Sequence, residues 1–201
     1  MTQQAVPQPT HSAVLVPVPE AEPVVARHRA RLDPAAALGV PAHVTVLYPF
    51  VPPAAITVVT IETLAAAVAS VASFGCVFPR TGWFGERVVW LAPQPDRPFR
   101  ALTAAVAAAF PQFPPYGGAF AEVVPHLTIG EWADSEAELQ RGAELLRGAE
   151  LLRGAELLRE AEASVLRALP VAAHVTRAWL MTGSSAPASW RTVAELPLAA
   201  S

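Results

Sequence analysis

The sequence contains no lysine and only a small share of charged residues. All 14 basic residues are arginine, charged residues make up 15% of the 201 positions, and the formal net charge is −3. This balance excludes the strongly basic surface of a protein that coats long nucleic acid, although it remains compatible with a small nucleotide or a single RNA end. We interpret the missing lysine, together with the abundant alanine and proline, as the effect of a GC-rich genome.

Cysteine and long apolar runs are equally scarce. The single cysteine, Cys76, excludes a disulfide framework within the chain, and its apolar neighbours favour a buried structural thiol. The longest apolar stretch, about residues 64–78, is interrupted by serine and glycine and is shorter than the roughly 20 residues that a membrane span requires. The N-terminus shows no basic segment followed by an apolar core, so no signal peptide is predicted. We therefore expect a soluble, cytoplasmic protein with no membrane partner.

Strands and helices are predicted to alternate along the chain in two similar halves. Apolar and β-branched runs bounded by proline or glycine predict the elements. The expected strands are residues 12–18, 43–48, 74–78, 87–91, 123–129, 171–181 and 190–196, and the expected helices are residues 20–31, 54–72, 98–110 and 135–169. This order predicts an α+β fold of two lobes in a pseudo-twofold arrangement. Residues 1–10 are expected to form a disordered N-terminus, and residues 11–201 a single bilobal domain.

The last expected helix contains a perfect repeat. The hexapeptide Gly-Ala-Glu-Leu-Leu-Arg occurs at residues 142–147, 148–153 and 154–159, behind a capping box formed by Ser135 and Glu138. A six-residue period rotates each copy by about 240° around the helix, so its leucines spiral and form no single stripe. Two interpretations follow. Either a slippage duplication lengthened a surface helix, or a protruding helix pairs with another chain in a homodimer.

Two tripeptides carry the residues best suited to chemistry. His43-Val44-Thr45 opens one expected strand, and His126-Leu127-Thr128 lies in another, one in each half of the chain. Side chains at positions i and i+2 of a strand share a face, so each tripeptide presents an imidazole beside a hydroxyl. If the halves are related by a pseudo-twofold, the two pairs converge on one cleft. Two imidazoles can then act as base and acid on a phosphodiester, while two hydroxyls donate to its non-bridging oxygens.

Other histidines and aromatic residues have weaker claims to function. A third tripeptide, His174-Val175-Thr176, has the same pattern, and we interpret it as non-catalytic. His11 lies near the expected disordered end, and His28 is expected to be solvated between two arginines of a helix. Most aromatic side chains are expected to belong to the core. The candidates for stacking on a base are Trp83 and Phe84, in an expected turn, and Tyr48.

The two motifs resemble the signature of the two-histidine (2H) phosphoesterases, which include 2'-5' RNA ligases and cyclic nucleotide phosphodiesterases. The resemblance rests on His43-Val44-Thr45-Val46 and His126-Leu127-Thr128-Ile129. Their surroundings, Leu47-Tyr48-Pro49-Phe50, Pro115-Tyr116-Gly117-Gly118 and Pro125, look like the bacterial 2'-5' RNA ligase branch. The similarity extends from about His11 to Leu198. It implies two pseudo-symmetric lobes of antiparallel sheet with outer helices and a central cleft, and metal-independent chemistry without a cofactor.

The resemblance also implies roles for the motif residues. His43 and His126 would be the catalytic pair, and Thr45 and Thr128 would bind the phosphate. The expected reaction is hydrolysis of the 2',3'-cyclic phosphate of a nucleotide or RNA end, giving a 2'-phosphate, with 2'-5' ligation as the reverse. Two alternatives remain open at this point. One is a nucleotide or RNA-end binding module without turnover, and the other is a metal-dependent hydrolase, although only Glu122 and Glu131 lie near the motifs.

Overall fold

The computed structural model describes residues 8–120, 122–132 and 144–200. Two four-stranded antiparallel sheets form its framework. The first sheet has the order β2-β1-β7-β8, and the second has the order β5-β4-β3-β6. The strands are β1 (His11–Pro17), β2 (His43–Leu47), β3 (Phe74–Phe84), β4 (Val88–Gln94), β5 (Leu127–Glu131), β6 (Val171–Val175), β7 (Arg177–Gly183) and β8 (Arg191–Pro197). The expected α+β fold with two lobes of antiparallel sheet is confirmed.

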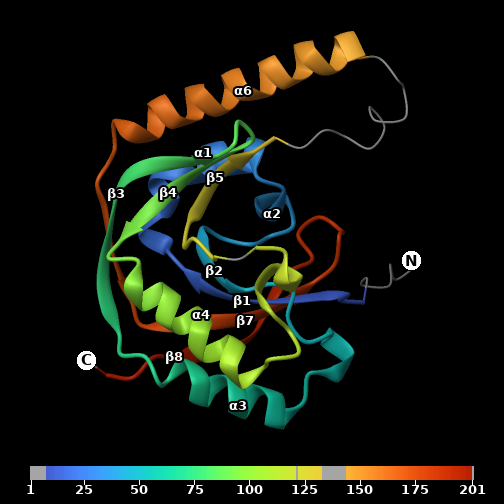
Figure 1. Cartoon of the computed structure of the whole chain (residues 1–201), viewed down its shortest axis with the longest axis vertical. Coiled ribbons are helices and arrows are strands. Elements are labelled where there is room, and N and C mark those ends of the chain that lie inside the picture. The colour runs from blue at the N-terminus through green and yellow to red at the C-terminus, as the bar shows by residue number, and fades with distance from the viewer. Residues whose placement is uncertain (1–7, 121, 133–143, 201) are drawn as a thin grey trace, which may run out of the picture.

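Helices cover the outer sides of both sheets (Figure 1). The helices are α1 (Glu22–Leu32), α2 (Pro34–Ala37), α3 (Val58–Val68), α4 (Arg97–Ala109) and α6 (Glu144–Leu166), with short 3-10 turns η1 (Pro19–Ala21), η2 (Pro53–Ala55) and η3 (Pro115–Gly118). Helices α1 and α6 pack on the second sheet, while α4 packs on β2 and α3 packs on β8 and α4. No helix within the described ranges is both long and apolar enough to cross a membrane.

Strand β1 has one face in each of two apolar clusters. Val14 and Val16 are fully buried in a large core that also contains Leu91 and Leu127 of the second sheet. Ala13 and Leu15 belong to a smaller cluster on the opposite face, together with Trp190. The alternation along β1 therefore separates a face that joins the two lobes from a face that borders the candidate site described below.

Several helices begin or end at other residues than predicted. Helix α3 begins at Val58 because Thr57 caps it in a capping box with Thr60, while the preceding turn η2 is separate. Helix α1 begins at Glu22 because the 3-10 turn η1 precedes it. Helix α4 was predicted within one residue at each end. The start of the expected helix at residues 135–169, with the Ser135–Glu138 capping box, lies outside the described residues.

Three strand predictions were wrong in ways that matter for the site. The strand predicted at residues 123–129 begins only at Leu127, as β5, so His126 precedes it. Pro125 has no N–H to pair, which explains the later start. Strand β3 runs on to Phe84, which places Trp83 and Phe84 in a strand, and the turn follows at Gly85, where φ is +56°. The segment 171–181 is two strands in different sheets, β6 and β7, joined at Thr176.

Thr10, the last residue of the segment that was expected to be disordered, is paired with β7. The backbone N–H of Thr10 donates to the carbonyl oxygen of Gly183 at 2.8 Å, which continues the pairing of β1 with β7. His11 is accordingly the first residue of β1. Residues 1–7, which were expected to be disordered as well, lie outside the described residues.

Candidate active site

The two His-x-Thr tripeptides meet where the two sheets approach each other. Strands β2 and β5 are edge strands of their respective sheets and lie against one another (Figure 1). Val44, Leu127 and Ile129 turn into the main core, so the alternating positions face the other way. One pocket of about 430 Å³ is lined by all four motif side chains, together with others from both lobes: His43, Thr45, His126, Thr128, Tyr48, Tyr116, Asp33, Glu131 and Trp190.

The two imidazoles are held in the same way. Nδ1 of His43 lies 2.7 Å from the carbonyl oxygen of Pro41, and Nδ1 of His126 lies 2.8 Å from that of Val124. Because a carbonyl oxygen can only accept, Nδ1 carries the proton in both rings and donates it. Each Nε2 is therefore left as the nitrogen available to accept or donate a proton in the pocket. The shared bond to the second residue before the histidine makes the two halves of the site equivalent.

Both rings favour their neutral form. Burial lowers the pKa of His43 to about 4, and the nearby Arg29 guanidinium contributes to this decrease. Burial also lowers the pKa of His126, although its hydrogen bond to Val124 opposes the effect. The charge of each ring disfavours the charge of the other, which lowers the pKa of His43 in addition. An anion between the two rings would reverse this balance, because it stabilises a protonated imidazole.

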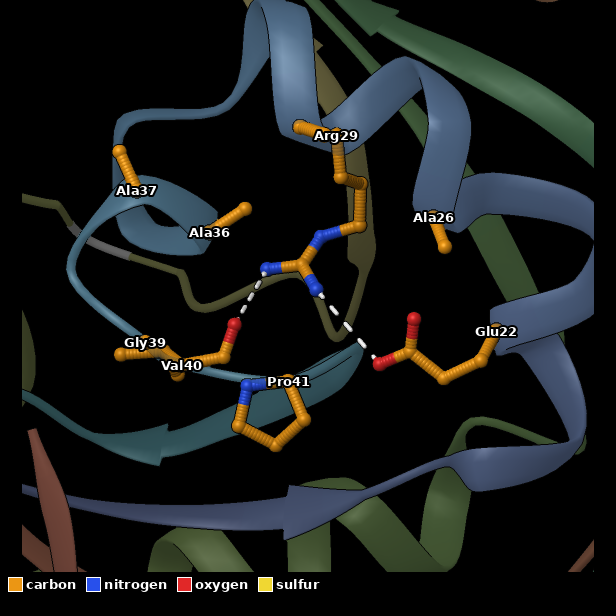
Figure 2. A pocket seen from close by; sticks show the side chains of 9 residues that line it. Glu22, Ala26, Arg29, Ala36, Ala37, Gly39, Val40 and Pro41 are labelled. Carbon is orange, nitrogen blue, oxygen red and sulfur yellow. Dashed lines mark hydrogen bonds and ion pairs between the residues drawn. The ribbon is translucent and has the colours of Figure 1, made fainter. Parts of the chain in front are cut away.

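A buried ion pair stands behind His43. The Nε of Arg29 donates to Oδ2 of Asp33 at 2.8 Å, and the other carboxylate oxygen of Asp33 accepts the N–H of Ala35 at 2.9 Å. The guanidinium also donates to the carbonyl oxygen of Val40 and approaches Glu22 (Figure 2). These bonds tie α1 and α2 to the segment that leads into β2, so they determine where His43 enters the pocket.

Glu22 supports the same segment from its other side. Its Oε1 accepts the backbone N–H of Ala42 at 2.6 Å, one residue before His43. Figure 2 shows Glu22 and the Arg29 guanidinium facing each other beside Pro41. Sequence reasoning overlooked this arrangement. The spacing of Arg29 and Asp33 by four residues was the available signal, since such pairs face each other along a helix.

Aromatic rings pack around His126. The rings of Phe84 and His126 meet edge to face, with centroids 4.9 Å apart and an interplanar angle of 85°. Trp90 lies 5.9 Å from His126 and stacks on Phe84 at 5.0 Å. This packing limits the rotation of the His126 ring and keeps water away from one of its sides.

Tyr116 enters the pocket from the loop before β5. Its backbone is left-handed, with φ of 52° and ψ of 32°, a conformation that costs a non-glycine residue about 1 kcal/mol or more. Its N–H donates to the carbonyl oxygen of Tyr48 at 2.7 Å, and its phenol lies close to the Thr45 hydroxyl. Burial raises the pKa of Tyr116. Sequence reasoning placed Tyr116 in a loop and assigned it no role.

A family model identifies the family to which the chain belongs. The sequence matches the family model of the 2'-5' RNA ligase superfamily over residues 16–184. The chain belongs to this superfamily. The resemblance to two-histidine phosphoesterases is thereby confirmed, and the superfamily consists of phosphoesterases and RNA ligases. A search of curated proteins found no match.

Solved structures share the superfamily fold. LigT of E. coli in its apo form is 18% identical, with a TM-score of 0.54 over 96% of this chain and 99% of that one. The complex of LigT with 3'-AMP is 17% identical, with a TM-score of 0.53 over 95% and 99%. TT0787 of Thermus thermophilus is 15% identical, with a TM-score of 0.53 over 94% and 98%. These similarities establish the fold that the superfamily member adopts.

Of the three aromatic candidates for base stacking, two lie at the site. Tyr48 lines the pocket, with its ring 6.4 Å from that of Trp190, and Phe84 packs on His126. Trp83 faces away from it, because its Nε1 donates to the carboxylate of Glu162 on α6 at 2.9 Å. Adjacent strand residues point to opposite faces of a sheet, which is why Trp83 and Phe84 separate.

The remaining histidines lie outside this pocket. His174 is exposed on β6, in the sheet opposite to that of His43. His28, which was expected to be solvated, is buried on α1 because that face of the helix packs against the body of the protein. His11 lies on β1 with its ring 6.4 Å from that of Tyr48. Within the described ranges, no group of three or more His, Cys, Asp or Glu side chains could hold a metal ion.

Proposed function

We propose that this protein hydrolyses the 2',3'-cyclic phosphate of a nucleotide or RNA end by metal-independent acid and base catalysis. The observation that carries the proposal is the equivalence of the two imidazoles. Both line one pocket with a threonine beside them, and both donate Nδ1–H to a carbonyl oxygen two residues earlier. Two such groups can take a proton from an entering oxygen and give one to a leaving oxygen in the same turnover.

We assign the base to His43 and the acid to His126. The pKa of about 4 leaves His43 neutral at pH 7, so its Nε2 can accept the proton of the attacking water. The water oxygen bonds to phosphorus as the bond from phosphorus to O3' breaks, and His126 gives its Nε2 proton to O3'. The product is a 2'-phosphate and a free 3'-hydroxyl. The bound phosphate supplies the negative charge that keeps His126 protonated before the reaction.

Thr45 and Thr128 are proposed to hold the phosphate between the imidazoles. Each hydroxyl can donate to a non-bridging oxygen, where charge accumulates in the transition state. The phenol of Tyr116, which lies close to Thr45 in the same pocket, would keep the Thr45 hydroxyl directed into the pocket. Ligation of a cyclic end to a 5'-hydroxyl would use the same groups in the opposite direction.

The surroundings of the pocket support a nucleotide as the ligand. A volume of about 430 Å³ lies in the range of sites for small molecules. Tyr48 and Phe84 provide aromatic surface on which a base could stack. Among the solved structures with this fold, E. coli LigT has been crystallised with 3'-AMP, ATP and NADP+.

The decisive experiment is an assay of the wild type, His43→Gln and His126→Gln against cyclic nucleotides and oligoribonucleotides with cyclic ends. Phosphorus NMR would identify the product, and each substitution should reduce turnover about 100-fold or more. His28→Gln, on α1 outside the pocket, is the matched control and should retain turnover. Full activity in either catalytic variant would refute the assignment. Calorimetric binding of a cyclic nucleotide without product in the wild type would instead favour a binding module, and loss of turnover on chelation would favour a metal-dependent hydrolase.

A further inference from the structure

A second pocket begins where the first one ends. Its volume is about 330 Å³, and its lining includes Pro17, Glu22, His174, Thr176, Arg177 and Trp179. Pro17 is paired directly with His43 across β1 and β2, and His43 lines the first pocket. The two pockets therefore border each other along the end of β1.

Register places Trp179 on the same sheet face as the phosphate-binding threonine. Leu15 of β1 is paired with Thr45 on one side and with Trp179 on the other. Residues that are directly paired across a sheet point to the same face, so the three side chains form a row. Neighbouring strands lie about 4.8 Å apart, so Trp179 is roughly 10 Å from Thr45. That separation allows two parts of one ligand to occupy both pockets.

The second pocket combines a flat apolar surface with polar groups. The Trp179 ring is half-buried, and its Nε1 has no hydrogen-bond partner in the part of the chain that the structure describes. The pocket also offers the imidazole of His174 and the hydroxyl of Thr176. His174 donates its backbone N–H to Glu20, a bond that leaves the imidazole ring available for a ligand.

The charges of this pocket favour a nucleobase in its centre with a phosphate at its rim. They disfavour a free phosphate in the centre. Arg177 pairs with Glu195 at 2.7 Å, but both side chains are about half exposed, so the pair is weak and the guanidinium can engage another anion. The carboxylate of Glu22 also lines the pocket and would repel a phosphate placed in its centre. A nucleobase can stack on Trp179 and accept hydrogen bonds, while its backbone phosphate lies near Arg177 at the rim.

We propose that this pocket is a second nucleotide subsite, which takes the base of the nucleotide next to the cyclic-phosphate end. The substrate is then the end of an RNA chain, and a mononucleotide fills only half of the available surface. This inference rests on the proposed function for the first pocket. In this proposal His174 and Thr176 of the third tripeptide bind the substrate, although they take no part in the chemistry.

The test compares a 2',3'-cyclic mononucleotide with a dinucleotide that ends in the same cyclic phosphate. The wild type should process the dinucleotide with a kcat/KM about tenfold higher, because each stacked base contributes affinity. Trp179→Ala should remove this advantage, mainly through KM, and should leave the mononucleotide kinetics unchanged. Trp179→Phe should retain most of the advantage, because it keeps an aromatic face. Arg177→Gln should lower kcat/KM for the dinucleotide only. The matched control is Arg167→Gln, because Arg167 is exposed at the end of α6 and should not affect either substrate.

Calorimetry separates failure of the subsite from failure of the proposed function. A dinucleotide and a mononucleotide that both end in a 2'-phosphate are titrated into the wild type and Trp179→Ala. Tighter wild-type binding of the dinucleotide, lost in Trp179→Ala, supports the subsite even if no cyclic phosphate is turned over. Equal binding of the two ligands, or an equal loss of both in the variant, would overturn the subsite whether or not cyclic phosphates are hydrolysed. Thermal unfolding of each variant would show that the fold is intact.

Discussion

The indole ring of Trp90 lies flat over Gly82 on the neighbouring strand. A Cβ added at Gly82 would come within 2.5 Å of the Trp90 ring, so only glycine leaves room for it there. The other sheet repeats the arrangement, since a Cβ at Gly183 of β7 would come within 2.4 Å of Trp190. In each lobe a glycine thus allows a tryptophan to lie close to the sheet beside the pocket.

Substitution of Gly82 should therefore impair turnover although it alters neither histidine of the proposed catalytic pair. Gly82→Ala displaces Trp90, which contacts both Phe84 and His126, so we expect kcat to fall about tenfold and stability to fall by about 1–3 kcal/mol. Gly75→Ala on the same strand is the matched control, because no atom lies within 4 Å of its added Cβ. Steady-state kinetics and thermal unfolding of both variants test this expectation. Equal behaviour of the two variants would contradict it.

Tyr116 should act through Thr45. Tyr116→Phe removes the hydroxyl that lies beside Thr45, and we expect kcat/KM to fall about three- to tenfold. Thr45→Val should cost more, because it removes the hydroxyl proposed to meet the phosphate. In the double variant the effects should be less than additive, since the two side chains lie close together. A double-mutant cycle in kcat/KM measures the coupling, and strict additivity would show that the two residues act independently.

The pH dependence of kcat/KM should be bell-shaped and lie on the acidic side of neutrality. His43 must be neutral to act as the base, so activity is lost only as the pH falls through its pKa of about 4. His126 must be protonated to act as the acid, and burial lowers its pKa, so activity declines as the pH rises towards the ordinary histidine value of about 6.5. The alkaline limb of kcat should lie higher, because the bound phosphate favours protonated His126. An alkaline limb of kcat/KM above about pH 8 would contradict this assignment.

Loss of Arg29 should destabilise the protein strongly. Its guanidinium is 3% exposed and its partner Asp33 is 6% exposed, so Arg29→Leu leaves a buried carboxylate without its cation. We expect a loss of about 3–5 kcal/mol in the free energy of unfolding. Arg31→Leu, on an exposed position of the same helix, should change it by less than about 0.5 kcal/mol.

A second variant distinguishes the pair from the packing around it. Arg29→Leu combined with Asp33→Leu removes both charges and should recover part of the stability lost in the single variant. Urea unfolding of the three proteins measures these differences. A double variant that is less stable than Arg29→Leu would show that Asp33 contributes mainly through its bond to the Ala35 N–H.

The repeat helix should not form a dimer. In the third copy of the hexapeptide, Ala155 and Leu158 are buried against the body of the protein, and Ala161 and Val165 continue the same face. This face is already used within the chain, where α6 packs on β5 and α1. Size-exclusion chromatography with light scattering should give the mass of one chain, and a mass of two chains would favour the interpretation of a pairing helix.

Much of the framework could be predicted from short-range patterns. The strand with His43 and the helix α4 follow from apolar spacing between prolines, and the convergence of the two tripeptides follows from their equivalent places in the halves. The change of sheet at Thr176 could not be predicted. No proline or glycine marks the passage, and the shift in phase between buried Val175 and buried Ala178 records which face a residue takes but not which sheet it joins.

The residues that support the site could not be predicted from sequence patterns either, for a different reason. Tyr116 reaches the pocket only because its backbone is left-handed, and the Pro115-Tyr116-Gly117-Gly118 motif, which supported the family resemblance, does not reveal that conformation. Arg29 and Asp33 looked like ordinary charges of a helix end, although the packing of α2 buries them both. Such residues depend on contacts between segments that are distant in sequence, so they require the fold to be known first.

Main-chain hydrogen bonds of the segment after β8 hold the two lobes in position relative to each other. The N–H of Leu198 donates to the carbonyl oxygen of Thr176, where the chain passes from one sheet to the other. Ala199 donates to Val71 and accepts from Ser73, at the earlier passage between the sheets. Main-chain atoms make all three bonds, so none of the bonds requires a particular side chain. The spacing between the imidazoles of His43 and His126 can therefore be maintained in relatives whose sequences differ at most positions.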